Sequence, residues 1–149
     1  MSPKSCLSEE LVKEILTVAL KALEPECIIV HGSYSRGMYI EGVSDVDLLI
    51  VSNGFSNMNI QERLGVLAWV FKGIRVTVEA VGLTPDEVME RMDDMDLYTL
   101  DAVFYGVPIY DDGFWRRAEE RLERLRDEVG LERIEDGWRI RRECYRNTG

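Results

Sequence analysis

The sequence predicts an α/β (α+β) domain with a small mixed β-sheet and helices packed on one side. Short apolar runs of strand length alternate with stretches of helical spacing, in the order helix, strand, helix, strand, helix, strand, then helices. The 149 residues suit one domain, and 46% hydrophobic residues can supply a core. We expect one domain over 1–149, with its core at about 8–111 and a C-terminal helix and strand within 114–142.

The first half of the chain predicts three helices and two strands, and the second helix is a short one that the turn at His31–Gly37 opens. Ser8 is a suitable helix cap, and the apolar positions after it recur at helical spacing until Pro25. The apolar runs Cys27–Val30 and Val46–Val51 are typical of buried strands. Residues 60–71 follow a helical period, and their apolar positions are Ile60, Leu64, Leu67, Ala68 and Phe71.

The second half begins with a predicted strand over Ile74–Val81, whose residues alternate between apolar and polar. A proline and acidic residues after Thr84 mark the start of a helix that runs to about Met92. Leu97–Phe104 predicts a second short helix.

Beyond these, we expect an edge strand at Val107–Tyr110 and a charged helix over Phe114–Val129 that Gly130 stops. One more strand is predicted around Trp138–Ile140.

Charge and composition narrow the function classes. The formal net charge of −10 repels phosphate backbones, so it disfavours long nucleic acid as a partner. A nucleoside triphosphate can still bind, because metal ions can bring it to carboxylates. The N-terminus lacks the apolar segment of a signal peptide, and no apolar run could span a membrane. The three cysteines lack metal-ligand spacing and suit reduced thiols in the cytosol; they are Cys6, Cys27 and Cys144.

The chemistry-bearing segment is Ser44–Val51. Asp45 and Asp47 are two residues apart on a predicted strand, so they project to the same face with Cα atoms ~6.5 Å apart. Val46 and Leu48 point the other way, into the core. Two carboxylates this close repel each other and become favourable when divalent cations lie between them.

Glu79 supplies a third carboxylate on the polar side of the next strand. If that strand pairs beside Val46–Val51, Glu79 meets Asp45 and Asp47. Three carboxylates can then hold two Mg²⁺ ions about 3.5–4 Å apart, as phosphoryl displacement requires.

A phosphate cradle precedes these carboxylates in the chain. Gly32 and Ser33 follow an apolar strand and open a turn, where backbone N–H groups and the Ser33 hydroxyl can bind phosphate. Arg36, one turn later, can reach a terminal phosphate with its guanidinium group.

Other polar and aromatic residues fit plainer roles. His31 is expected to pack or form hydrogen bonds at a strand end, and Tyr34 fits either base stacking or simple packing. The charged run Arg116–Asp127 is expected to be a solvated helix face. The larger aromatics suit the core or a partner surface, and these are Trp69, Phe71, Tyr98, Phe104 and Trp115.

Over about residues 28–85 the chain resembles the minimal nucleotidyltransferases (MNT) of the DNA polymerase beta-like superfamily. The resemblance is carried by Gly32–Gly37, by Ser44–Leu48 and by Glu79. The chain departs from the common pattern in its eleven-residue spacer between Ser33 and Asp45, and in having Glu rather than Asp as the third acid.

The resemblance implies a polymerase beta-like fold and a metal-dependent transfer of a nucleoside monophosphate, AMP, from ATP or another nucleoside triphosphate to a hydroxyl group. Asp45, Asp47 and Glu79 would be the catalytic residues and would bind two Mg²⁺ ions, with Glu79 placed to take the acceptor proton. Gly32, Ser33 and Arg36 would bind the nucleotide. The implied partner is a helical HEPN-type protein, as in toxin–antitoxin pairs, and the implied acceptor is a tyrosine of that partner. A homodimer is a further expectation.

Two other functions stay open at this point. One is a nucleotide- and partner-binding module of the same fold with weak or no turnover, which the long spacer and Glu79 favour. The other is an enzyme that modifies a small molecule, such as an antibiotic adenylyltransferase. The presence of fewer than forty residues after Asp111 disfavours it, because such enzymes usually carry an extra helical domain.

Overall fold

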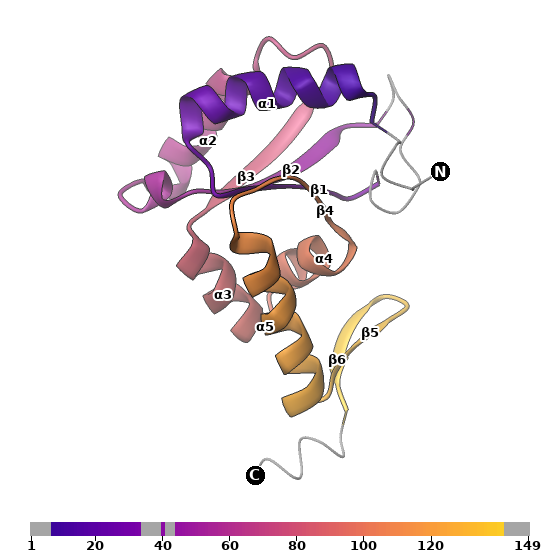
Figure 1. Ribbon diagram of the computed structural model, residues 1–149. Coiled ribbons are helices and arrows are strands. Elements are labelled where there is room, and N and C mark those ends of the chain that lie inside the picture. Colours follow the sequence, from indigo (N-terminus) through magenta and orange to yellow (C-terminus); the bar gives the residue numbers. More distant parts are fainter. Residues whose placement is uncertain (1–6, 34–39, 41–43, 142–149) are drawn as a thin grey trace.

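The computed structural model describes residues 7–33, 40 and 44–141 (Figure 1). The helices are α1 (Glu9–Leu23), η2 (Asn53–Phe55), α2 (Ile60–Phe71), α3 (Pro85–Asp93), α4 (Leu97–Tyr105) and α5 (Phe114–Glu128). The strands are β1 (Cys27–His31), β2 (Val46–Val51), β3 (Val78–Leu83), β4 (Val107–Asp111), β5 (Leu131–Ile134) and β6 (Gly137–Ile140). No described helix is long and apolar enough to cross a membrane.

Four strands form one mixed sheet in the order β3-β2-β1-β4. β1 pairs antiparallel with both β2 and β4, whereas β2 and β3 are parallel and are connected through η2 and α2. The predicted mixed sheet is therefore confirmed, and β4 is an edge strand as expected.

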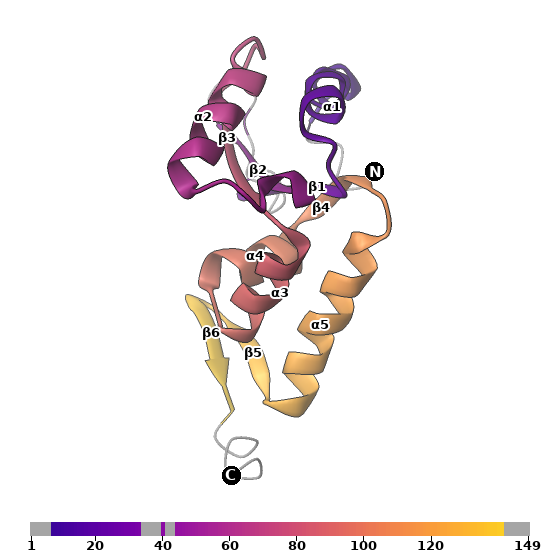
Figure 2. The same cartoon turned by 90° about the vertical axis from the view of Figure 1, so that its left-hand side faces the viewer.

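Helices cover both faces of this sheet, which corrects the expectation that they pack on one side (Figure 2). On one face Ile28 and Ile50 pack with α1 and α2, and on the other Ile29 and Leu49 pack with α3, α4 and α5. The reason lies in the two central strands, whose side chains are apolar on both alternating faces, so that each face must be covered.

Two helices start where the sequence predicts a cap, at Ser8 and Thr84, and two more have caps that it did not identify. The side chains of Ser8, Asn59, Thr84 and Asp96 each accept a hydrogen bond from a backbone N–H in the first helical turn. At Asn59 and Thr84 a glutamate three residues later completes a capping box.

β3 begins later than predicted. The expected strand was Ile74–Val81, but the observed pairing starts where Val46 meets Val78, because β2 itself begins there and offers no partner to the preceding residues. The predicted alternation holds within β3, since Val78 and Ala80 pack on the side of α1 and α2 and Glu79 lies on the other face.

α2 uses a different buried face from the one predicted. Leu67 and Phe71 are buried as expected, but Ile60 and Leu64 are exposed, and Arg63 takes their place in the interior. The Arg63 guanidinium donates to three backbone carbonyls and to both carboxylate oxygens of Glu87, at 2.6 and 3.0 Å. A cation with this many acceptors can be buried where a periodicity argument expects an apolar residue.

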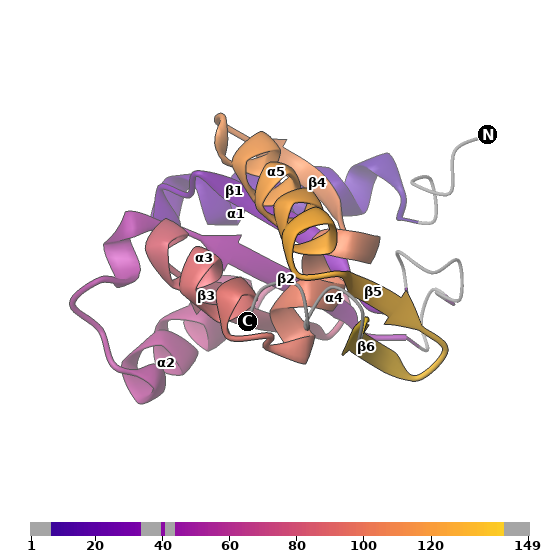
Figure 3. The same ribbon diagram turned by 90° about the horizontal axis from the view of Figure 1, so that it is seen from below.

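The C-terminal segment contains a hairpin rather than one isolated strand. β5 and β6 pair antiparallel in a separate two-stranded sheet beside α4 and α5 (Figure 3). The indole Nε1–H of Trp138 donates to Asp101 of α4 at 2.8 Å, and the Arg133 guanidinium pairs with the same carboxylate at 3.3 Å. The hairpin is thereby attached to α4.

Candidate active site

Asp47 and Glu79 are direct neighbours on the parallel strands β2 and β3. His31 of β1 is the register partner of Asp47 on its other side. Register partners in a sheet point to the same face, so these three side chains form a row across the sheet, on the face covered by α3, α4 and α5. Asp45 is exposed just before β2, two residues from Asp47.

The packing of neighbouring side chains explains why the Asp47 carboxylate faces away from the core formed with α1 and α2. Val46 and Leu48 are fully buried in that core, as predicted, and their alternation with Asp47 directs the carboxylate to the opposite face. The structure thus brings Asp47 and Glu79 together, as the pattern of the two strands predicted, with Asp45 close in sequence.

The carboxyl groups interact strongly. The pKa of Asp47 is raised from its ordinary value of 3.8 to about 6, chiefly by burial and then by a hydrogen bond with Glu79 and the charges of Glu79 and Asp45. Among the described residues, no arginine or lysine forms an ion pair with Asp45, Asp47 or Glu79.

These donors fit a hard divalent cation, because carboxylate oxygens are its preferred ligands and a cation would relieve the repulsion that raises the pKa of Asp47. In the part of the chain that the structure describes, no three histidine, cysteine, aspartate or glutamate side chains already form a ready metal cluster. Asp47 and Glu79 are register partners on the two strands, and Asp45 precedes Asp47 by two residues in the chain.

Gly32 lies against Asp47. Its φ of +72° favours glycine, and a Cβ atom built on it would collide with the Asp47 carboxylate. Ser33 follows, half-buried, in the same turn. The predicted phosphate cradle is thus placed beside the predicted carboxylates, whereas Arg36 and Tyr34 lie outside the described residues.

Tyr98 is also part of this neighbourhood, although the sequence assigned it only to the core or a partner surface. It lies in the first turn of α4, and its hydroxyl is 2.8 Å from Nε2 of His31. Burial, followed by the charges of Asp47 and Asp96, raises the pKa of Tyr98 well above its usual range. The two residues are 67 positions apart, so no local pattern could reveal their contact.

His31 is buried and hydrogen bonded, as expected of a residue at a strand end. Burial lowers its pKa to about 4, partly opposed by the charge of Asp101, so the ring is neutral at pH 7.

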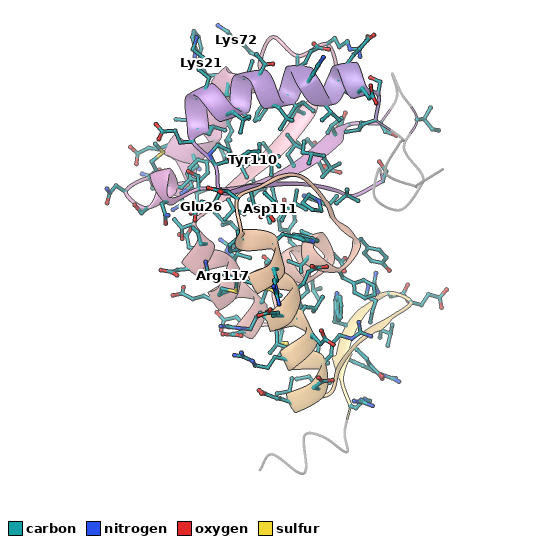
Figure 4. All side chains as sticks on the ribbon, viewed as in Figure 1. Lys21, Glu26, Lys72, Tyr110, Asp111 and Arg117 are labelled. Atoms are coloured by element: carbon teal, nitrogen blue, oxygen red, sulfur yellow. The ribbon has the colours of Figure 1, made fainter. Side chains whose placement is uncertain are left out.

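At the opposite end of β1, Cys27 pairs with Asp111, which Figure 4 labels beside Glu26. Burial raises the pKa of the Cys27 thiol to about 12, which fits the expected reduced thiol.

Comparison with known families gives one match over most of the chain: the family model described as a nucleotidyltransferase domain matches residues 12–128. No curated protein matches the sequence.

Solved structures of similar fold include chains from three toxin–antitoxin complexes. A chain from a toxin–antitoxin with AMP-PNP is 14% identical over 80% of this chain and 92% of its own, with a TM-score of 0.52. A mutant form of the toxin–antitoxin MntA-HpeT gives the same identity and coverage and a TM-score of 0.51. A chain from the tri-AMPylated Shewanella oneidensis HEPN toxin in complex with MNT antitoxin is 13% identical over 83% of this chain and 93% of its own, with a TM-score of 0.50. At these identities the similarity shows the fold.

Proposed function

The chain belongs to the nucleotidyltransferase domain family, and we propose that it transfers AMP from ATP to a hydroxyl group with release of pyrophosphate. The observation that carries this proposal is the pairing of Asp47 with Glu79 on adjacent strands, next to the turn at Gly32. A triphosphate bound at that turn lies beside the carboxylates that act on it.

In the proposed reaction the acceptor oxygen attacks the α-phosphorus of ATP, and the bond from that phosphorus to pyrophosphate breaks. Glu79 takes the proton of the acceptor hydroxyl, while Asp45 and Asp47, with Glu79, are the metal ligands. Bound Mg²⁺ ions supply neutralisation of the phosphate charges. Gly32, Ser33 and Arg36 bind the triphosphate, and in this proposal 8–111 is the catalytic core of a single domain.

We further propose that the acceptor is a tyrosine of a helical HEPN-type partner. The support comes from the similar solved structures, since one of them is a tri-AMPylated HEPN toxin with its MNT antitoxin. The high negative charge of this chain also favours a protein acceptor over long nucleic acid.

The test is a transfer assay with ATP labelled at the α-phosphate, Mg²⁺ and a HEPN-type protein encoded beside this chain. We expect label on the partner with the wild type and none with Asp45→Asn. Binding of ATP without transfer would instead favour a nucleotide- and partner-binding module, for which Glu79 as third acid and the eleven-residue spacer before Asp45 are the specific observations.

A further inference from the structure

The end of β1 is fixed by a polar contact that crosses from the sheet to α4. The hydroxyl of Tyr98 lies 2.8 Å from Nε2 of His31, and the two rings meet edge to face with centroids 5.0 Å apart. His31 is only 9% exposed. A buried polar pair of this kind holds one geometry, because breaking it would leave two unsatisfied groups.

The contact between His31 and Tyr98 lies next to the row that contains Asp47 and Glu79. His31 is the register partner of Asp47, and Asp47 is the register partner of Glu79. The next residue, Gly32, touches the Asp47 carboxylate closely enough that an added methyl group would collide with it. The backbone at His31 and Gly32 therefore forms the surface against which the Asp47 carboxylate rests.

α4 also contacts the C-terminal hairpin formed by β5 and β6. Asp101, one turn after Tyr98, accepts a hydrogen bond from Trp138 of the C-terminal hairpin and pairs with Arg133. The helix that carries Tyr98 is thus attached both to the hairpin and, through His31, to the sheet. A displacement of Tyr98 would be transmitted to the residues next to Asp47.

We propose that Tyr98 is a positioning residue: through His31 it holds the end of β1 and Gly32 so that the Asp47 carboxylate stays beside Glu79 in the geometry that a divalent cation requires. This inference rests on the proposed function, because it assumes that the row binds a metal. It assigns no contact between Tyr98 and the substrate. Groups that orient metal ligands typically change metal affinity 10–100-fold when removed.

The test measures binding of Mn²⁺ to the full chain by the electron paramagnetic resonance signal of the free ion, without ATP or acceptor. Tyr98→Phe keeps the ring and removes the hydroxyl, and we expect it to raise the Mn²⁺ dissociation constant about tenfold. Tyr110→Phe is the matched control, since it makes the same chemical change on β4, at the register partner of Ile28 (labelled in Figure 4). Tyr110 packs on the side of α1 and α2, the face opposite the row. We expect the control to bind Mn²⁺ like the wild type.

A double variant tests whether Tyr98 acts through His31. If it does, Tyr98→Phe combined with His31→Gln binds Mn²⁺ no more weakly than His31→Gln alone. Additive losses would overturn the proposed route. Circular dichroism confirms folding of each variant, and His31→Gln alone gives the same comparison if Tyr98→Phe is unfolded.

The outcomes separate the two proposals. A wild type that binds Mn²⁺ with the same affinity as Tyr98→Phe overturns the role of Tyr98 and leaves the proposed function standing. A wild type that binds no Mn²⁺ overturns both. A purely structural role of Tyr98 would lower the melting temperature and leave the dissociation constant unchanged.

Discussion

Asp47 and Glu79 face the same side of two parallel strands as direct register partners, and their carboxyl groups share a hydrogen bond. Two acids in this arrangement cannot both be charged without cost, so one of them keeps a proton to a higher pH. In the proposed function, a divalent cation bound at these acids, beside the Gly32 turn, would offset this cost.

The first prediction concerns stability against pH. The pKa of Asp47 is raised to about 6, so the folded chain holds this proton to higher pH than the unfolded chain, and folding is weakened as the pH rises from about 4 to about 6. Asp47→Asn removes this effect. Without metal, we expect the variant to be more stable by about 1–2 kcal/mol at pH 7.5, allowing for solvent screening, and about equal to wild type at pH 4.

Urea denaturation of both proteins across this pH range measures the difference. A difference that does not change with pH would show that folding does not raise the pKa of Asp47.

The second prediction concerns divalent cations. Mg²⁺ at about a hundred times its Kd should stabilise the folded chain by about 2.7 kcal/mol, which raises the Tm by roughly 5–10 °C. Calorimetry should show this rise in the wild type and in Glu135→Gln, an exposed residue of the hairpin turn. It should be lost in Asp45→Asn and Glu79→Gln; an equal rise in Asp45→Asn would remove that residue from the metal site.

The third prediction concerns the close approach at Gly32. In Gly32→Ala the positive φ costs about 1–2 kcal/mol, and the new methyl group displaces the Asp47 carboxylate. We expect AMP transfer to fall at least about tenfold while the Tm falls by only a few degrees. Gly73→Ala is the control, because open space surrounds that position. Wild-type transfer in Gly32→Ala would contradict the account.

The fourth prediction concerns the buried arginine of α2. In Arg63→Met the three backbone carbonyls and Glu87 lose their donor, so we expect the free energy of unfolding to fall by about 3–5 kcal/mol. Arg124→Met changes an exposed arginine of α5 and should stay within about 0.5 kcal/mol of wild type. Denaturation in urea measures both, and equal losses would show that the buried hydrogen bonds contribute nothing.

Local patterns in the sequence predict much of this fold. Caps such as Ser8 and Thr84 set helix starts, and the alternation around Glu79 identifies its face, because both depend on residues close together in the chain. The placement of Asp47 beside Glu79 needed one further assumption, that the two strands are neighbours.

Features that depend on distant residues could not be predicted in this way. In the sequence, Arg63 looks like an exposed residue of an amphipathic helix. Its burial is favourable because backbone carbonyls of η2 and β3 accept hydrogen bonds from its guanidinium group. Tyr98 meets His31 across 67 residues. The apolar runs of both central strands favour cover on both faces of the sheet, but which helices supply it depends on packing between distant residues.

The central claim is that Asp45, Asp47 and Glu79 hold the metal against a triphosphate bound at the Gly32 turn. A crystal of the chain grown with Mn²⁺ and a non-hydrolysable ATP analogue tests it most directly, through the anomalous signal of manganese. We expect anomalous density in ligand contact with the Asp47 and Glu79 carboxylates and with the phosphates of the analogue. Manganese bound elsewhere, or an analogue bound away from Gly32 and Ser33, would contradict it.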